Sequence, residues 1–94
     1  MVTEIVRIDI HPEKESAFEA AIAQAKAVLL AGGARKLDLL RGIERPSHYQ
    51  LHLEWDSVEA HVAFTKTDGI QQFRALVGPF LADKPQMEHF CIAL

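Results

Sequence analysis

The amino-acid sequence predicts an α+β fold in which helices cover one face of an antiparallel β-sheet. Apolar and polar residues alternate with a period of two in segments 2–11 and 48–55, which is typical of half-buried strands. In segment 13–31 apolar residues recur every three to four positions, which indicates a helix with one apolar face. A chain of 94 residues is expected to form a single domain, residues 1–94, with a thin core.

Strands are expected in four segments, residues 2–11, 35–42, 48–55 and 86–94. The first of them places Val6, Ile8 and Ile10 on one face. The third has the cleanest alternation, and its apolar face consists of Tyr49, Leu51, Leu53 and Trp55. Turn-forming residues at 44–47 separate the second strand from the third, so these two strands are expected to pair as a hairpin.

The first helix is expected from residue 13 to residue 30 or 31. Pro12 suits the start of a helix, and Glu13 suits the opening turn because the helix dipole favours acids there. Gly32 and Gly33 are expected to end this helix, because glycine readily adopts the left-handed backbone conformation that follows many helix C-termini.

Two shorter helices are expected after the third strand. Asp56 is predicted to cap the first of them in a capping box with Glu59, and that helix is expected to end near Lys66. The second is expected to start at Asp68 and to break at Gly78-Pro79. Its inward residues are expected to be Ile70, Phe73, Leu76 and Val77.

The predicted order is strand, helix, strand, strand, helical pair, strand, which is the split βαβ pattern of a ferredoxin-like fold. Helices cover one face of such a sheet, and the other face here also carries apolar residues. The simplest cover is the sheet of a second copy, so the chain is predicted to form a homodimer, a dimeric α/β barrel.

Composition argues against several classes of protein. The 10 Lys and Arg residues are scattered among 13 Asp and Glu residues, so no basic surface for nucleic acid is expected. The longest apolar run, residues 27–31, is too short to cross a bilayer. The acidic start does not resemble a signal peptide, and a single cysteine, Cys91, cannot form an internal disulfide. We therefore expect a cytoplasmic protein without membrane or nucleic-acid partners.

Two stretches of the chain resemble the antibiotic-biosynthesis monooxygenase family. One is the strand-to-helix junction, Glu54-Trp55-Asp56-Ser57-Val58-Glu59-Ala60-His61. The other is Phe73-Arg74-Ala75-Leu76-Val77-Gly78-Pro79-Phe80, followed by Pro85 and Glu88-His89-Phe90. The resemblance implies a homodimeric α/β barrel with a pocket between sheet and helices. It further implies a cofactor-independent monooxygenase that oxygenates a small, planar, electron-rich aromatic or polyketide-like compound without metal or flavin.

One departure from the family keeps other functions open. The chain contains no asparagine, whereas the haem-degrading and antibiotic-pathway branches use a pocket asparagine beside the tryptophan. This absence favours an alternative, a non-catalytic small-molecule-binding or stress-associated dimeric barrel. A third hypothesis is a protein that binds or degrades haem, although the absence of asparagine argues against haem degradation.

His61 is the predicted catalytic residue. Cofactor-free oxygenation needs a base to remove a proton from a phenol or enol, and the ordinary pKa of imidazole, near 6.5, suits that role. His61 follows Val58 by three positions on the apolar side of its helix, which is expected to face the sheet. The alternative is a histidine at the helix edge, hydrogen-bonded to backbone or solvent.

Six further residues are predicted to bind substrate. Trp55 either packs in the core or walls the pocket, and Tyr49 on the same face could donate a hydrogen bond. If Phe90 packs under the helices, together with Ile92, then His89 faces the partner copy in a structural role and Glu88 lies on the pocket side. The full set is Trp55, Tyr49, Phe64, Phe73, Glu88 and His89.

Metal and phosphate sites are not expected. His48 and His52 are four residues apart on a strand, a span of roughly 13 Å, so they cannot share one ion. His52 and Glu54 are instead expected to form a polar layer between the two sheets. Gly32-Gly33 follows a helix and lacks the Lys-Ser/Thr of a phosphate loop, and Cys91 has no signature of a catalytic thiol. No cofactor is therefore expected.

Overall fold

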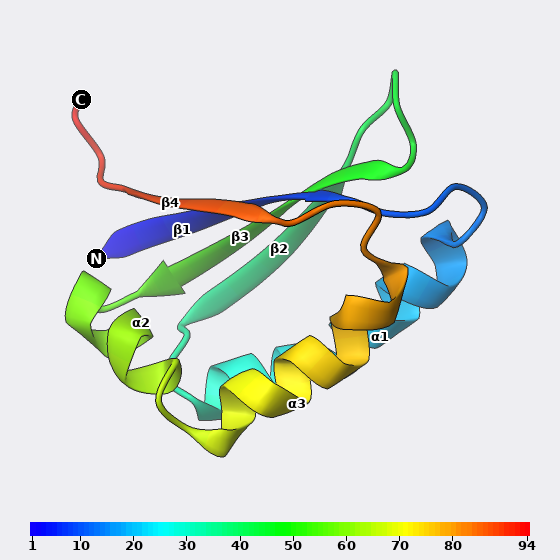
Figure 1. The fold of residues 1–94 in the computed structure, drawn as a ribbon. Helices are drawn as coiled ribbons and strands as arrows, with labels where there is room; N and C mark the ends of the chain where they lie inside the picture. Colours follow the sequence, from blue (N-terminus) through cyan, green and yellow to red (C-terminus); the bar gives the residue numbers. More distant parts are fainter.

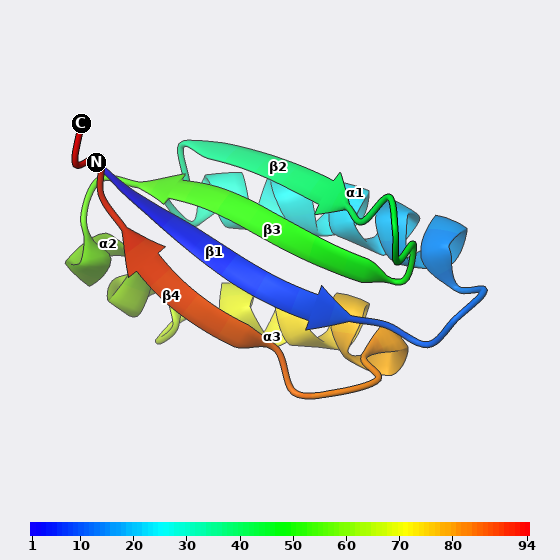
Figure 2. The same ribbon diagram turned by 90° about the horizontal axis from the view of Figure 1, so that it is seen from above.

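The computed structural model describes residues 1–94 and has an α+β ferredoxin-like fold, as predicted. Its elements are β1 (Val2–Asp9), α1 (Glu15–Ala31), β2 (Lys36–Arg41), β3 (His48–Trp55), α2 (Val58–Phe64), α3 (Asp68–Val77), a 3₁₀ turn (Gly78–Phe80) and β4 (Gln86–Phe90). The strands form one antiparallel sheet in the order β2-β3-β1-β4. All helices lie against one face of the sheet (Figure 1), and the other face is bare when seen from above (Figure 2).

β3 is the centre of the core, and its predicted alternation is confirmed. All four apolar-face residues of β3, from Tyr49 to Trp55, are buried, and they pack against α1 residues such as Phe18. β1 lies beside β3, and its inward face carries Ile8 and also the acidic residue Glu4. The strand pairing therefore places one carboxyl group inside an otherwise apolar layer.

The first helix begins two residues later than predicted. Glu13 has a left-handed backbone (φ +70°), so Pro12 and Glu13 form a turn before the helix rather than its first turn. The side chain of Glu15 accepts a hydrogen bond from the backbone N–H of Glu13 at 3.1 Å, which fixes that turn. At the other end Gly33 has φ +115° and provides the left-handed exit, while Gly32 remains right-handed.

The predicted cap of the second helix is also wrong by one residue. The hydroxyl of Ser57 accepts a hydrogen bond from the backbone N–H of Ala60 at 3.1 Å and caps α2, which ends at Phe64. Asp56 instead accepts two hydrogen bonds from the Arg35 guanidinium, at 3.1 and 2.9 Å. A partner distant in sequence thus draws the Asp56 side chain away from the helix.

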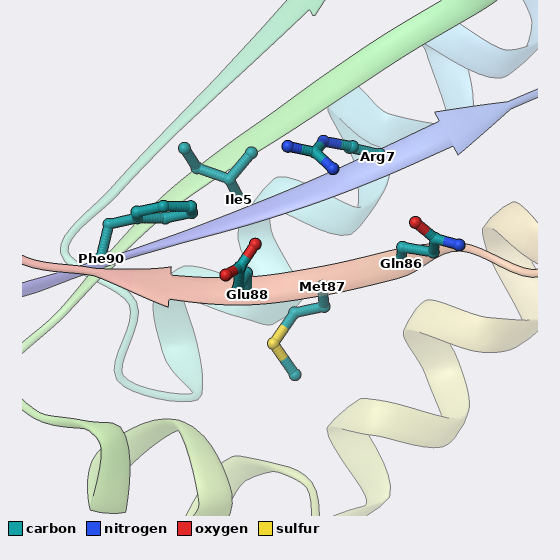
Figure 3. A pocket seen from close by; sticks show the side chains of 6 residues that line it. All are labelled: Ile5, Arg7, Gln86, Met87, Glu88 and Phe90. Atoms are coloured by element: carbon teal, nitrogen blue, oxygen red, sulfur yellow. The ribbon is translucent and has the colours of Figure 1, made fainter.

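The predicted facing of the last strand is wrong. In the antiparallel register Val6 is opposite Met87 and Glu4 is opposite His89, and opposite residues share a face. Met87 and His89 therefore face the helices, whereas Glu88 and Phe90 lie on the open face. Figure 3 shows Glu88 and Phe90 there, with Met87 pointing the other way, toward the helices. β4 ends at Phe90, so Ile92 belongs to no strand.

No helix in the structure combines the length and the hydrophobicity that a bilayer crossing requires.

Candidate functional site

A cavity of about 240 Å³ lies between the sheet and helices α2 and α3. This volume is slightly below the roughly 300–1,000 Å³ that is typical of ligand pockets, so it suits a small molecule. The charged or titratable groups on its wall are Glu4, His61 and Arg74. Its apolar wall consists of Val6, Leu29, Leu51, Leu53, Trp55, Phe64, Ile70, Phe73 and Met87.

One end of the cavity holds a cluster of Glu4, Trp55, His61 and His89, from four different elements. The imidazole of His61 stacks on the indole of Trp55 with 5.0 Å between ring centroids and 27° between planes. Its Nδ1 lies 2.8 Å from Nε2 of His89. Its Nε2 lies 3.4 Å from Oε1 of Glu4, which also accepts a hydrogen bond from Trp55 Nε1 at 3.0 Å. The cluster is therefore a continuous polar chain inside an apolar wall.

Local structure explains why these side chains meet. The Ser57 cap starts α2 directly after β3, so His61, about one helical turn along, returns over the end of β3 and contacts Trp55. Glu4 is opposite Leu53 in the β1–β3 ladder, which makes Trp55 its diagonal neighbour. His89 is directly opposite Glu4 on the other flanking strand. Strand register and one helix cap together build the cluster.

Burial shifts the pKa values of the two buried titratable groups, His61 and Glu4, in opposite directions. The pKa of His61 is lowered, first by burial and then by the neighbouring His89. The pKa of the Glu4 carboxyl is raised by burial, an effect that the hydrogen bond from Trp55 partly offsets. His61 therefore rests as a neutral imidazole at neutral pH, the form that can accept a proton.

Only one nitrogen of His61 is available to a ligand. Nδ1 is occupied by the contact with His89, and one proton lies on that line because a hydrogen bond between two ring nitrogens needs one donor and one acceptor. Nε2 makes no hydrogen bond. The structure contains no fully buried side-chain nitrogen or oxygen without a hydrogen-bond partner, so Nε2 is not fully buried. Since His61 lines the cavity, Nε2 is open to it and can meet a substrate proton.

The predicted site residues are only partly brought together. His61, Trp55, Phe64 and Phe73 all line the cavity, and His89 joins it through His61. Trp55 is fully buried and the imidazole covers its face, so its contribution is to hold the His61 ring in position by stacking.

Tyr49 and Glu88, two of the residues predicted to bind substrate, do not line this cavity. Tyr49 lies at the opposite end of β3 and donates a hydrogen bond to Glu19 at 2.7 Å. Burial and Glu19 raise the pKa of Tyr49 to about 12, so it remains a neutral donor committed to that carboxylate. Glu88 lies on the open face of the sheet.

The histidines of the open face have separate partners. His48 Nδ1 contacts Asp9, and His52 Nε2 contacts Gln50 at 3.0 Å. His52 and Glu54 also border a shallow hollow on this face together with Lys36 and Asp38. The polar layer that we predict between two sheets stays a prediction, because it requires a second copy.

Glu4 and Arg74 were not among the predicted site residues. Glu4 occupies an even-numbered position, like the inward residues Val6 and Ile8, so the alternation of β1 could have placed it inside. Arg74 is exposed and lies on α3 at the wall of the cavity, four residues after Ile70 and three before Val77, so helical spacing could have placed it near the inward face.

The family model described as antibiotic biosynthesis monooxygenase matches residues 1–76. The chain belongs to this family. A solved structure from Bordetella bronchiseptica, provisionally assigned as an antibiotic biosynthesis monooxygenase, is 36% identical with a TM-score of 0.95, covering 99% of this chain and 97% of that one. No curated protein sequence matches the chain significantly.

More distant structures share the fold of this family member. A Caulobacter crescentus protein with the same provisional assignment is 22% identical with a TM-score of 0.82, covering 95% of this chain and 86% of that one. SnoaB, a cofactor-independent oxygenase from Streptomyces nogalater solved as an asparagine-to-alanine variant, is 18% identical with a TM-score of 0.85, covering 99% of this chain and 93% of that one.

Proposed function

We propose that residues 1–94 act as one domain, a monooxygenase that uses His61 as base and molecular oxygen as oxidant. The substrate class is a small, planar phenol or enol that is the tautomer of a ketone whose reactive CH₂ carbon is adjacent to the carbonyl or conjugated with it through the ring. The observation that carries the proposal is the placement of His61, which lines an apolar cavity while its Nδ1 is held by His89. The lowered pKa of His61 agrees with a role as base. Membership of the monooxygenase family supports the same reaction class.

The first step is a proton transfer. His61 Nε2 takes the proton of the substrate O–H, the O–H bond breaks, and its electron pair is delocalised onto the ring carbon. That carbon forms a C–O bond with molecular oxygen, which is reduced to a peroxide anion. The protonated His61 then returns its proton to the terminal peroxide oxygen. The apolar wall excludes water, which would otherwise protonate the carbanion.

The second step releases water. His61 Nε2 removes the hydrogen that remains on the same carbon, the C=O bond forms, and the O–O bond breaks. The departing hydroxide takes the proton from His61. One oxygen atom thus enters the substrate and the other becomes water, and the CH₂ carbon supplies all four electrons, so no further reductant is required.

Oxygen uptake tests this proposal. The protein is added to a panel of quinols and anthrone-type compounds in an oxygen-electrode cell, with and without a metal chelator. We expect at least one compound to be consumed with one O₂ per product formed, at a rate that the chelator leaves unchanged. Absence of uptake across the panel contradicts the proposal. A compound that raises the melting temperature and is recovered unchanged supports the non-catalytic binding alternative instead, which the lack of asparagine favours.

We further propose that two copies of the chain pack their open sheet faces together. Helices cover only one face (Figure 2), while half-exposed apolar residues lie on the other, including Leu40 and Phe90, which is 42% exposed. Phe90 and Ile5 border a hollow of about 150 Å³ on this face, together with Arg7 and Glu88 (Figure 3). A second sheet would bury these side chains.

Sedimentation equilibrium tests the dimer. We expect a mass of twice 10.5 kDa at micromolar concentration, and Phe90→Glu should shift the protein toward 10.5 kDa because it places a charge in the interface. Ile43→Glu is the matched control, since Ile43 is 90% exposed in the loop between β2 and β3. A folded monomer of the unmodified protein at this concentration contradicts the proposal.

A further inference from the structure

Glu4 is the one acidic side chain that the fold buries, at 5% exposure. Burying a carboxyl is unfavourable unless it is paired, so its surroundings are informative. Its Oε1 accepts the Trp55 N–H at 3.0 Å and faces His61 Nε2 at 3.4 Å. Glu4 also lines the cavity, and its position in β1 places it beside Trp55 and His89.

We infer that Glu4 is a positioning residue for catalysis, whose carboxylate stabilises the imidazolium that forms when His61 accepts the substrate proton. This inference rests on the proposed function of His61. The proton arrives at Nε2, the nitrogen that lies beside Glu4 Oε1. The positive charge that forms on the imidazole therefore lies beside a carboxylate oxygen that is already in place, without rearrangement of the site.

Among the charged residues on the cavity wall, only Glu4 is acidic and can therefore stabilise a positive His61. The titratable groups that face His61 are Glu4 from β1 and His89 from β4, and α3 contributes Arg74 to the cavity wall. β3 contributes the uncharged Trp55, and no other charged residue lines the cavity. His89 disfavours a positive His61, and Glu4 is the only acidic residue on the cavity wall, so without Glu4 the imidazolium would be buried with no counter-charge.

Trp55 completes the arrangement because it holds Glu4 in place. Its N–H donates a hydrogen bond to Glu4 Oε1, the oxygen that faces His61, and its ring stacks on the imidazole. A hydrogen bond to the ionised form favours the carboxylate over the protonated acid, which counteracts burial. One side chain thus orients both members of the Glu4–His61 pair.

Titration of His61 in Glu4→Gln by NMR tests the inference without any substrate. Glutamine keeps the shape of the side chain and an oxygen for the Trp55 N–H, but removes the charge. We expect the pKa of His61 to fall by roughly 1–3 units, the usual effect of losing an adjacent opposite charge. In the oxygenation assay the rate at pH 7 should fall tenfold or more, and the acid limb of the pH profile should move to lower pH.

Glu59→Gln is the matched control, because Glu59 lies on α2 close to His61 in sequence but is exposed. It should leave both the His61 pKa and the rate unchanged. Glu4→Asp retains the charge and should restore part of the His61 pKa, which also provides a second variant should Glu4→Gln fold poorly. An unchanged or raised His61 pKa in Glu4→Gln overturns the inference. Because this titration needs no turnover, its result is independent of whether any compound is oxygenated.

Discussion

Replacing His61 by glutamine is expected to lower kcat/KM for the oxygenated substrate by about 10²–10⁴-fold, the usual contribution of a positioned general base. Glutamine can retain a polar contact with His89 but cannot accept a proton at neutral pH. The buried imidazole is 7% exposed, so the replacement also has to keep the packing on Trp55. Steady-state oxygen uptake measures the change, and the melting temperature establishes that the variant is folded.

The pH dependence provides a second measurement on the same residue. Because the pKa of His61 is lowered from 6.5, the base remains unprotonated at mildly acidic pH. The acid limb of kcat/KM should therefore have its midpoint below 6.5, with activity lost as the pH falls through the His61 pKa. His11→Gln serves as the control, because His11 is exposed in the loop after β1 and should behave like the parent protein. A folded His61→Gln variant of full activity would exclude His61 as the base.

Phe18→Ala is expected to destabilise the fold by about 3–5 kcal/mol, as is usual when a buried phenylalanine is truncated. Phe18 is 0% exposed, and its ring lies 4.8 Å from that of Tyr49 and 6.1 Å from that of Phe80. It joins α1 to the sheet and to the segment after α3. Native domains are stable by only about 5–15 kcal/mol, so this one substitution should remove much of the total.

Urea unfolding measured at one fixed protein concentration checks this expectation, because dimerisation would make the apparent stability depend on concentration. Ile43→Ala is the control and should change the free energy of unfolding by no more than about 0.5 kcal/mol, since Ile43 is 90% exposed. A loss below 1 kcal/mol for Phe18→Ala would mean that the core closes around the missing ring.

Much of the fold could be predicted because the strongest elements carry unambiguous periods. β3 was predicted at its observed bounds, 48–55, since every second residue is apolar over the whole strand. The element starts that differ from the prediction depend on a contact or a backbone angle that residue type alone does not specify. Asp56 has the chemistry of a helix cap, yet Arg35 binds it, and the positive φ of Glu13 delays α1. Local propensity contains no information about either effect.

The site was harder to predict than the fold for two physical reasons. Both faces of β4 mix polar and apolar residues, so only its register with β1 decides that His89 and not Glu88 turns toward the helices. Sharing a face also does not mean sharing a pocket. Tyr49 and Trp55 face the same way, but six residues of strand separate them by roughly 20 Å. The sequence does predict the position of His61, because helical spacing and its place just after Trp55 both put it over the sheet.

Trp55 is the only tryptophan of the chain, and its indole touches both Glu4 and His61. Its ultraviolet emission therefore comes from one place, and imidazolium is a stronger quencher of excited indole than neutral imidazole. The protein thus carries a built-in optical probe that reads the charge on His61 without any label. Occupancy of the cavity and proton uptake can both be followed through this single fluorophore, in real time and in dilute solution.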